Sequence, residues 1–237
     1  MASRRSTDLL DGALMRSPSR AQPMMFDTAR TATRGDLADM ASLPERPGRN
    51  SVGPRSLAYR HPDRSENRLE AHFSAYPEGT FISEEEGQII GYVCSVRVSE
   101  DLITTPAKWA DLFPGRTEFA PQTTGGWLYV SHFACTAGLG HAHLSNEIGP
   151  LLTALQHHAS RLDLTGVAFP APFLGLRDRS GTDAFQRSTI ADPRSLDRSG
   201  LRPIGVAYYR GFRHGIALPN YLGDSRHFAL MVWKAHA

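Results

Sequence analysis

Residues 136–152, TAGLGHAHLSNEIGPLL, combine glycines with a following apolar run in a way that suits phosphate binding. The first turn of a helix offers free backbone N–H groups and the positive end of the helix dipole, and both favour an anion. Glycines also let the backbone approach a phosphate closely. The segment therefore predicts a helix whose N-terminus could hold a phosphate-bearing cofactor.

Pro150 decides where this helix is expected to begin. A helix that starts near Gly140 would carry Pro150 in its interior, at a cost of about 3 kcal/mol. A helix that starts at Pro150 avoids this cost, because the first helical residue needs no N–H partner. We therefore expect the helix to span residues 150–162, with the anion at residues 147–151 and Gly138 and Gly140 in a short insertion.

Other reactive residues give weaker patterns. Cys94 and Cys135 lie in apolar, strand-like runs and are expected to be buried free thiols. His141 and His143 could join Cys135 at a metal, but this spacing is common and no carboxylate supports it, so we expect no metal. A G-x-S-x-G motif is absent from the sequence, which leaves hydrolase chemistry without support.

The composition excludes several classes of protein. The 237 residues carry a formal net charge of +2 and no Lys/Arg-rich run, so we expect no nucleic-acid partner. No apolar run reaches the ~18 residues that a membrane span needs. Residues 1–24 lack the apolar core of a secretory signal, and Asp8 and Asp11 argue against a transit peptide. We expect a cytoplasmic protein without a membrane partner.

Hydrophobic periodicity and turn signals predict the order β–α–α–β–β–β–loop–α–β–α–β–β. Residues 25–43 read as a strand and a helix capped by Asp36, and residues 65–76 as a helix with Ser65 as its N-cap. Gly211 should end a short helix in the left-handed conformation. The remaining strands are expected at residues 80–83, 88–98, 127–136, 164–172, 212–217 and 227–234.

The chain is expected to form a single domain over residues 25–237, preceded by a flexible tail at residues 1–24. Two long polar segments, at residues 104–125 and 173–203, are expected to be surface loops. Loops of such length are uncommon in compact domains unless they are functional or mobile. They are therefore candidates to surround an acceptor site.

Four motifs resemble the GCN5-related N-acetyltransferase (GNAT) superfamily. They are GQIIGYVCSV (87–96), LYVSHFACT (128–136), EIGPLLTAL (147–155) and YYRGFR (208–213). The resemblance implies an α/β (α+β) fold with a central mixed, mostly antiparallel seven-stranded sheet flanked by helices.

A closer resemblance lies within that superfamily. YPEG (76–79), Trp109 and residues 211–233, with their LPNYL stretch, are similar to GNAT domains fused to carbon–nitrogen hydrolases and to GNAT-like loading domains of polyketide synthases. The loading domains suggest decarboxylation or acyl transfer to a carrier protein. The polar residues of that subgroup fall on Phe113 and Pro121 here, which departs from the pattern.

The resemblance implies a donor site. The backbone of Ala134, Cys135 and Thr136 would hold pantetheine, and Ile148, Gly149 and Leu151 would bind the pyrophosphate. In the register that begins at Pro150, Leu144 replaces the family's Arg or Gln, and Glu147 replaces its first glycine. A carboxylate beside a pyrophosphate is repulsive unless it points away or pairs with a cation.

The resemblance also implies an acid and a base for acyl transfer to an amine. His132 is the one obvious base in its strand, and its ordinary pKa of about 6.5 suits neutral pH. Tyr208 resembles the family's acid, with Tyr209 as a competitor because the motif is one residue shorter.

These residues predict a GNAT-type acyltransferase of biosynthetic, specialised metabolism. Its co-substrate would be acyl-CoA or the phosphopantetheine of an acyl carrier protein, and its acceptor a small molecule or a carrier-bound intermediate. A homodimer stays open. The alternatives are another reaction on an acyl thioester, such as decarboxylation, condensation or cyclisation, and a non-catalytic GNAT-fold binding module.

Overall fold

The computed structural model describes residues 29–43, 57–58, 66–105, 125–136, 141–172, 202–218, 221 and 228–236. The predicted tail at residues 1–24, most of the predicted loops, Ser65 and the Gly138–Gly140 insertion lie outside these residues. So do Trp109, Phe113 and Pro121 of the closer resemblance.

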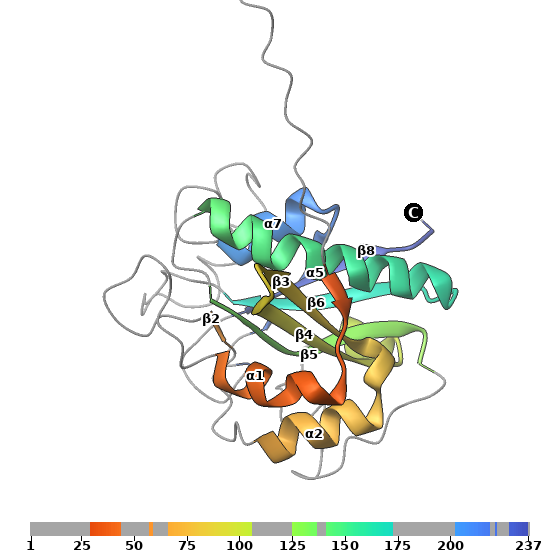
Figure 1. The fold of residues 1–237 in the computed structure, drawn as a ribbon. Helices are drawn as coiled ribbons and strands as arrows, with labels where there is room; N and C mark the ends of the chain where they lie inside the picture. The colour runs from red at the N-terminus through yellow and green to blue at the C-terminus, as the bar shows by residue number, and fades with distance from the viewer. Residues whose placement is uncertain are drawn as a thin grey trace, which may run out of the picture.

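A mixed sheet forms the centre of the molecule, with strand order β1-β3-β4-β5-β6-β8-β7 (Figure 1). Every neighbouring pair on this path is antiparallel except β5 and β6. The seven-stranded, mostly antiparallel sheet predicted from the sequence is therefore confirmed. Its strands are β1 (Ala29–Thr31), β3 (Thr80–Glu85), β4 (Gln88–Val98), β5 (Trp127–Cys135), β6 (Gly166–Pro172), β7 (Arg213–Leu218) and β8 (Phe228–Lys234).

An additional short strand, β2 (Leu57–Ala58), pairs with β5 off this path. It follows a Pro/Gly-rich stretch of the sequence at residues 45–56. Two residues are too few for a period-2 pattern to be visible, so this strand could not be predicted.

Helices cover both faces of the sheet (Figure 1). On one face lie α1 (Leu37–Ser42) and α2 (Glu66–Ala75), and on the other lie α5 (His141–Arg161) and α7 (Arg202–Tyr209). A short helix, α3 (Asp101–Thr104), follows β4 and was not predicted. None of the helices in the described ranges is long and apolar enough to cross a membrane.

The sheet separates two hydrophobic cores. The larger core packs α5 and α7 against the sheet through side chains such as Ile148, Leu155 and Ile204. The smaller core packs α1 and α2 against β3 and β4, with Met40 and Ile82 fully buried. The apolar side predicted for the central helix is mostly confirmed, since Leu151, Leu152, Leu155 and Ala159 are buried while Leu162 is 40% exposed.

The start of α5 contradicts the expectation that the helix begins at Pro150. The helix begins at His141, so Pro150 lies in its interior. The proline removes one backbone hydrogen bond, but Ile148, Leu151 and Leu152 on both sides of it are almost completely buried in the larger core. Tertiary packing of the apolar face therefore outweighs the local cost of the proline.

Two turn residues behave differently from each other. Gly211 ends α7 with φ of 87°, as predicted. Asp36 stands at the N-cap position of α1, but its side chain makes no hydrogen bond to the first turn of that helix. Its carboxylate instead accepts hydrogen bonds from the N–H of Thr33 at 2.7 Å and from Arg30 at 2.8 Å, one turn earlier.

Candidate functional site

The parallel strands β5 and β6 separate after a short ladder. They pair only from Trp127 to Tyr129, whereas β6 stays paired with β8 as far as Pro172. On its other side, β5 contains a bulge, because Cys94 lies opposite His132 and Ser95 lies opposite Val130. Bulges bend strands and recur beside active sites. The sheet therefore opens between β5 and β6 next to Ser131 and His132.

His132 lies in a buried chain of polar side chains beside this opening. Its Nδ1 is 3.4 Å from the Ser131 hydroxyl, which is 3.1 Å from Nε2 of His72 on α2. The two imidazole rings meet edge to face, with centroids 5.2 Å apart. The Ser131 hydroxyl also lies 3.1 Å from the carbonyl oxygen of Cys94, to which it donates. The structure thus holds the predicted base in a fixed His–Ser–His arrangement.

Sequence reasoning missed His72. It is fully buried and lies on the side of α2 that carries Leu69 and Phe73. The sequence feature that could have pointed to it is a polar residue at helical spacing from those apolar positions, on the face of the helix that is buried. Buried polar groups need hydrogen-bond partners, so such a residue points to a polar group on the facing strand.

The predicted pantetheine position on β5 is occupied by another part of the chain. Leu57 and Ala58 of β2 pair with Cys135 and Ala134. The N–H of Thr136 donates to the carbonyl of Ile90 at 2.8 Å. In this structure the backbone of Ala134, Cys135 and Thr136 is therefore engaged within the sheet rather than open to a ligand.

The residues predicted to bind the pyrophosphate lie inside α5. Ile148, Gly149 and Leu151 are in its middle turns, where backbone N–H groups serve the helix itself. The prediction that they form the anion-binding end is wrong, because the helix starts earlier. Gly149 instead gives room to a cation, since a Cβ there would be 2.7 Å from Nη2 of Arg210.

Glu147 is also inside the helix, and it points toward the sheet. Its side chain is buried, and Oε1 accepts a hydrogen bond from the Thr136 hydroxyl at 3.1 Å. This contact fixes α5 against the end of β5. The carboxylate therefore does not lie at the helix N-terminus, where it would have repelled a phosphate.

Tyr208 and Tyr209 differ in their surroundings. Tyr209 is 68% exposed, while Tyr208 packs partly buried against the larger core. The Arg213 guanidinium lies 4.7 Å above the centre of the Tyr208 ring. Tyr208 belongs to α7, on the opposite face of the sheet from His72 and His132. The predicted acid and the predicted base therefore lie on opposite faces of the sheet, and the β5–β6 opening lies beside them.

The LPNYL stretch contributes a buried contact near this opening. Tyr221 accepts a hydrogen bond from the Tyr129 hydroxyl at 2.9 Å. Tyr129 is the last residue of β5 that pairs with β6. Burial holds the pKa of Tyr129 above its ordinary value, so its hydroxyl stays protonated and serves this structural bond.

The YPEG stretch has a structural role as well. The Tyr76 hydroxyl lies 3.0 Å from Nε2 of His158 on α5, and a Cβ at Gly79 would collide with the Tyr76 ring. His158 is buried while its neighbour His157 is exposed, as their helical spacing predicts. Burial, aided by Arg161, lowers the pKa of His158. This favours the neutral imidazole, which can accept a hydrogen bond.

Both cysteines are free and buried, as predicted. Burial raises the pKa of Cys94 to about 12, which leaves its thiol protonated and unreactive at neutral pH. Within the described ranges, no group of three or more His, Cys, Asp and Glu side chains is placed to hold a metal ion.

Comparison by sequence finds no match: no protein-family model fits the chain, and no curated protein matches it. Comparison by structure does find matches. The chain is similar to the loading GNATL domain of CurA from Lyngbya majuscula, with a TM-score of 0.62 and 15% identity over 88% of this chain and 97% of that one. It is also similar to the GphF GNAT-like decarboxylase in complex with isobutyryl-CoA, with a TM-score of 0.54 and 17% identity over 88% and 100%.

A third match is an N-acetyltransferase. The aminoglycoside 6'-N-acetyltransferase from Enterococcus faecium has a TM-score of 0.50 and 10% identity, over 89% of this chain and 98% of that one. At such identities the matches report architecture alone. The sheet order, the β5–β6 opening and these matches agree: the chain has the GNAT fold.

Proposed function

We propose that this protein is a GNAT-fold enzyme of acyl thioesters, which moves an acyl group from a pantetheine thioester to a small-molecule or carrier-bound acceptor. The observation that carries the proposal is the opening between β5 and β6, with the His72–Ser131–His132 chain at its side. Strands that separate beside a buried chain of polar side chains add no stability to a sheet, so the arrangement favours a functional role.

In this proposal His132 is the base. The acceptor amine loses its surplus proton to His132 and attacks the thioester carbonyl. A C–N bond forms, the C–S bond breaks, and the departing sulfur takes a proton from Tyr208 or from water, which regains one from the nitrogen as the amide forms. Ser131 and His72 position the imidazole of His132, because they hold its ring from one side.

The start of α5 supports CoA as a donor. Glu147 would weaken CoA binding if it stood at the helix N-terminus. It lies instead in the interior of α5, and its carboxylate faces Thr136 at the end of β5. The helix begins at His141, so its free N–H groups follow the glycines of residues 138–140. The complex of the GphF decarboxylase with isobutyryl-CoA supports the same donor class.

Calorimetry with acetyl-CoA, isobutyryl-CoA and a pantetheinylated carrier protein tests the donor. We expect micromolar binding of at least one thioester, and binding of the carrier alone would assign the donor to carrier proteins. If no thioester binds, the proposal is wrong and the fold serves as a binding module.

Variants test the base. We expect His132→Gln to lower kcat by about 10²- to 10⁴-fold with donor affinity unchanged. His72→Gln should shift the pH profile of kcat as well as lower it, because it acts through His132. His157→Gln, on the exposed side of α5, is the matched control and should keep full activity.

Decarboxylation of an acyl thioester is the second candidate, supported by the likeness to the GphF decarboxylase. A malonyl thioester would lose carbon dioxide, and His132 in its protonated form would protonate the resulting enolate carbon. Incubation with malonyl-CoA in the absence of an acceptor separates the two reactions. Acetyl-CoA formed without acceptor would favour decarboxylation over transfer.

A further inference from the structure

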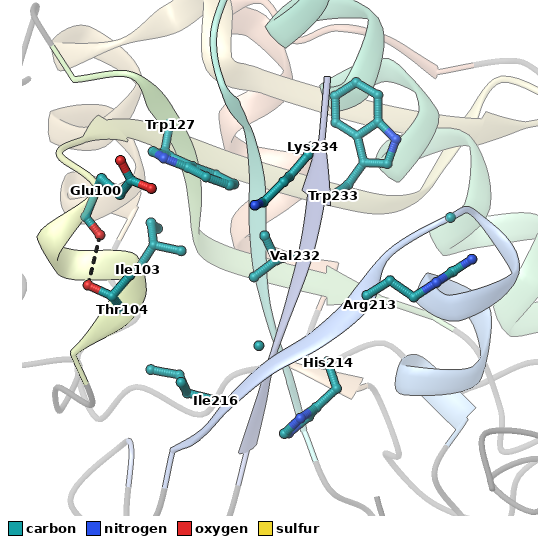
Figure 2. A pocket seen from close by; sticks show the side chains of 12 residues that line it. Glu100, Ile103, Thr104, Trp127, Arg213, His214, Ile216, Val232, Trp233 and Lys234 are labelled. Carbon is teal, nitrogen blue, oxygen red and sulfur yellow. Dashed lines mark hydrogen bonds between the residues drawn. The ribbon is translucent and has the colours of Figure 1, made fainter. Parts of the chain in front are cut away.

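A cavity lies beside Trp127, the first residue of β5. Its volume is about 620 Å³, which is in the range of pockets that bind small molecules. Figure 2 shows side chains from α3, β5, β7 and β8 around it. Its lining includes Glu100, Ile103, Trp127, Ile216, Val232 and Lys234.

The cavity lies away from the predicted donor residues of β5. Trp127 is the first residue of β5, and it lies beside Gly166, which pairs with Lys234. The predicted donor residues are at the other end of this strand of 9 residues, about 25–30 Å away at the usual rise per residue. A ligand in this cavity would therefore leave the predicted donor residues free.

The walls of the cavity are apolar. Trp127 and Ile103 are 2% and 5% exposed, and Ile216 and Val232 are half-buried around the open space. A bulge at Gly215 shapes β7 here, since a Cβ at that position would be 2.9 Å from Cγ2 of Val232. These walls suit a ligand with an apolar body.

Two charges of opposite sign line the same cavity. Figure 2 shows Lys234 extending between Trp127 and Val232 toward the centre, and Glu100 on the far side of Trp127. Both side chains are exposed, and neither forms a salt bridge within the part of the chain that the structure describes. Among the described residues no ion pair joins the two to each other either.

The other basic groups at the cavity do not face its centre as a charge. Arg213 keeps its charge, but its side chain extends away from Lys234 and Trp127 (Figure 2) and lies over the Tyr208 ring, where it donates to the carbonyl oxygen of Phe212 at 2.9 Å. Burial lowers the pKa of His214, which favours its neutral form. Lys234 and Glu100 are therefore the two charges that a ligand would meet.

We infer that this cavity binds a zwitterionic small molecule with an apolar body, such as an apolar dipeptide or amino acid. Its carboxylate pairs with Lys234, its ammonium pairs with Glu100, and its apolar part lies against Trp127 and Ile103. A fatty acid would leave Glu100 facing an apolar chain, and a phosphate-rich ligand would be repelled by it. Only a ligand with both charges satisfies both side chains.

The small number of lysines gives a direct assay. Lys108 and Lys234 are the two lysines of the chain, so reductive ¹³C-methylation adds two lysine signals to the NMR spectrum, besides that of the terminal amine. Both lysines keep their charge. Lys234→Met assigns one signal, which we expect to move saturably on titration with phenylalanyl-leucine or tryptophan.

Charge-deleted ligands and calorimetry on the unmodified protein complete the test. We expect N-acetyl and C-terminal amide forms to bind at least tenfold more weakly than the zwitterion. Glu100→Gln should weaken the zwitterion but not its N-acetyl form, and Glu86→Gln, in the exposed β3–β4 turn, is the matched control. His132→Gln should bind as the wild type does.

Three outcomes would overturn the inference. They are the absence of saturable binding up to millimolar ligand, equal affinity for the zwitterion and its charge-deleted forms, and a Lys234 signal that stays in place while the ligand binds. Because Glu100 is exposed, Glu100→Gln keeps the test valid even if Lys234→Met fails to fold.

Discussion

Ser131 has contacts on three sides, toward His72, His132 and the carbonyl oxygen of Cys94. Because its hydroxyl donates to that carbonyl, its lone pairs are left to accept from an imidazole N–H. This fixes which ring nitrogens can carry protons, and the tautomer of a histidine decides whether it can act as a base. At the residue scale, the candidate chemistry thus depends on Ser131 as much as on His132.

Asp36 supports a pH-dependent part of the stability. Arg30, and then Thr33, hold the pKa of its carboxyl well below its usual range. A lowered carboxyl pKa stabilises the folded state above the unfolded pKa of about 4, and this stabilisation is lost as the pH falls further. Because Arg30 is 43% exposed, solvent screening limits the contribution to about 1 kcal/mol.

We therefore expect Asp36→Asn to lower the free energy of unfolding by about 1 kcal/mol at pH 7. Urea denaturation from pH 7 to pH 2 measures the difference from wild type, which should shrink below about pH 4. Glu86→Gln, in the exposed β3–β4 turn, is the control. A difference that stays constant over this pH range would contradict the role given to the Asp36 charge.

At the element scale, α5 joins both halves of the sheet and carries a proline in its interior. Pro150→Ala restores an N–H donor to the helix and improves its intrinsic propensity. We expect the variant to be about 1–3 kcal/mol more stable in chemical denaturation. Ser160→Ala, at an exposed position of the same helix, should gain only a few tenths.

The opposite result would also be informative. A helix that began at Pro150 would use the proline as its first residue, and the alanine variant would then be less stable or unchanged. The experiment therefore tests the start of α5, on which the CoA argument depends.

β2 occupies the edge of β5 that the family resemblance assigns to pantetheine. If the donor pairs there, β2 has to leave. Leu57→Cys places a thiol opposite Cys135, and antiparallel partners lie within the Cα distance that a disulfide spans. We expect the oxidised variant to lose donor binding by at least tenfold, and a reductant to restore it.

Calorimetry with and without reductant measures this effect. The double variant Leu57→Cys with Cys135→Ala cannot form the bond and should bind the donor in both conditions. Cys94 should not interfere, since its thiol is buried and has a pKa of about 12. Equal binding by the oxidised and reduced forms would show that the donor does not use this edge.

At the scale of the whole molecule, the sheet separates the two cores, and their residues share few contacts. Ile148→Val in the larger core and Ile82→Val in the smaller one should each cost about 0.5–1.5 kcal/mol. We expect their effects to add within about 0.5 kcal/mol, measured by denaturation of the single and double variants. A larger coupling would mean that the cores respond to each other through the sheet.

The sequence predicted the elements whose signals are local. The 80–98 hairpin, β5 and the glycine end of α7 follow from alternation, aromatic content and φ > 0, and each was confirmed. The start of α5 was wrong because a local rule about proline was overruled by burial of the surrounding face.

The site depended on signals that a single sequence does not carry. The pairing of β2 with β5 and the contact between His72 and Ser131 join residues that are far apart in the chain. The bulge at Ser131 is a property of the register between two strands. Alternation within one strand cannot show a register.

The pairing of β5 with β6 is the one parallel contact along the path of the described strands. It divides the sheet into two antiparallel parts, β1-β3-β4-β5 before α5 and β6-β8-β7 after it. The strand pairing between the two parts ends at Tyr129. Beyond this point buried side chains join them, such as Phe133 and Phe169 with ring centroids 5.6 Å apart, so an acyl chain that entered between β5 and β6 would have to displace side-chain packing but no strand pair.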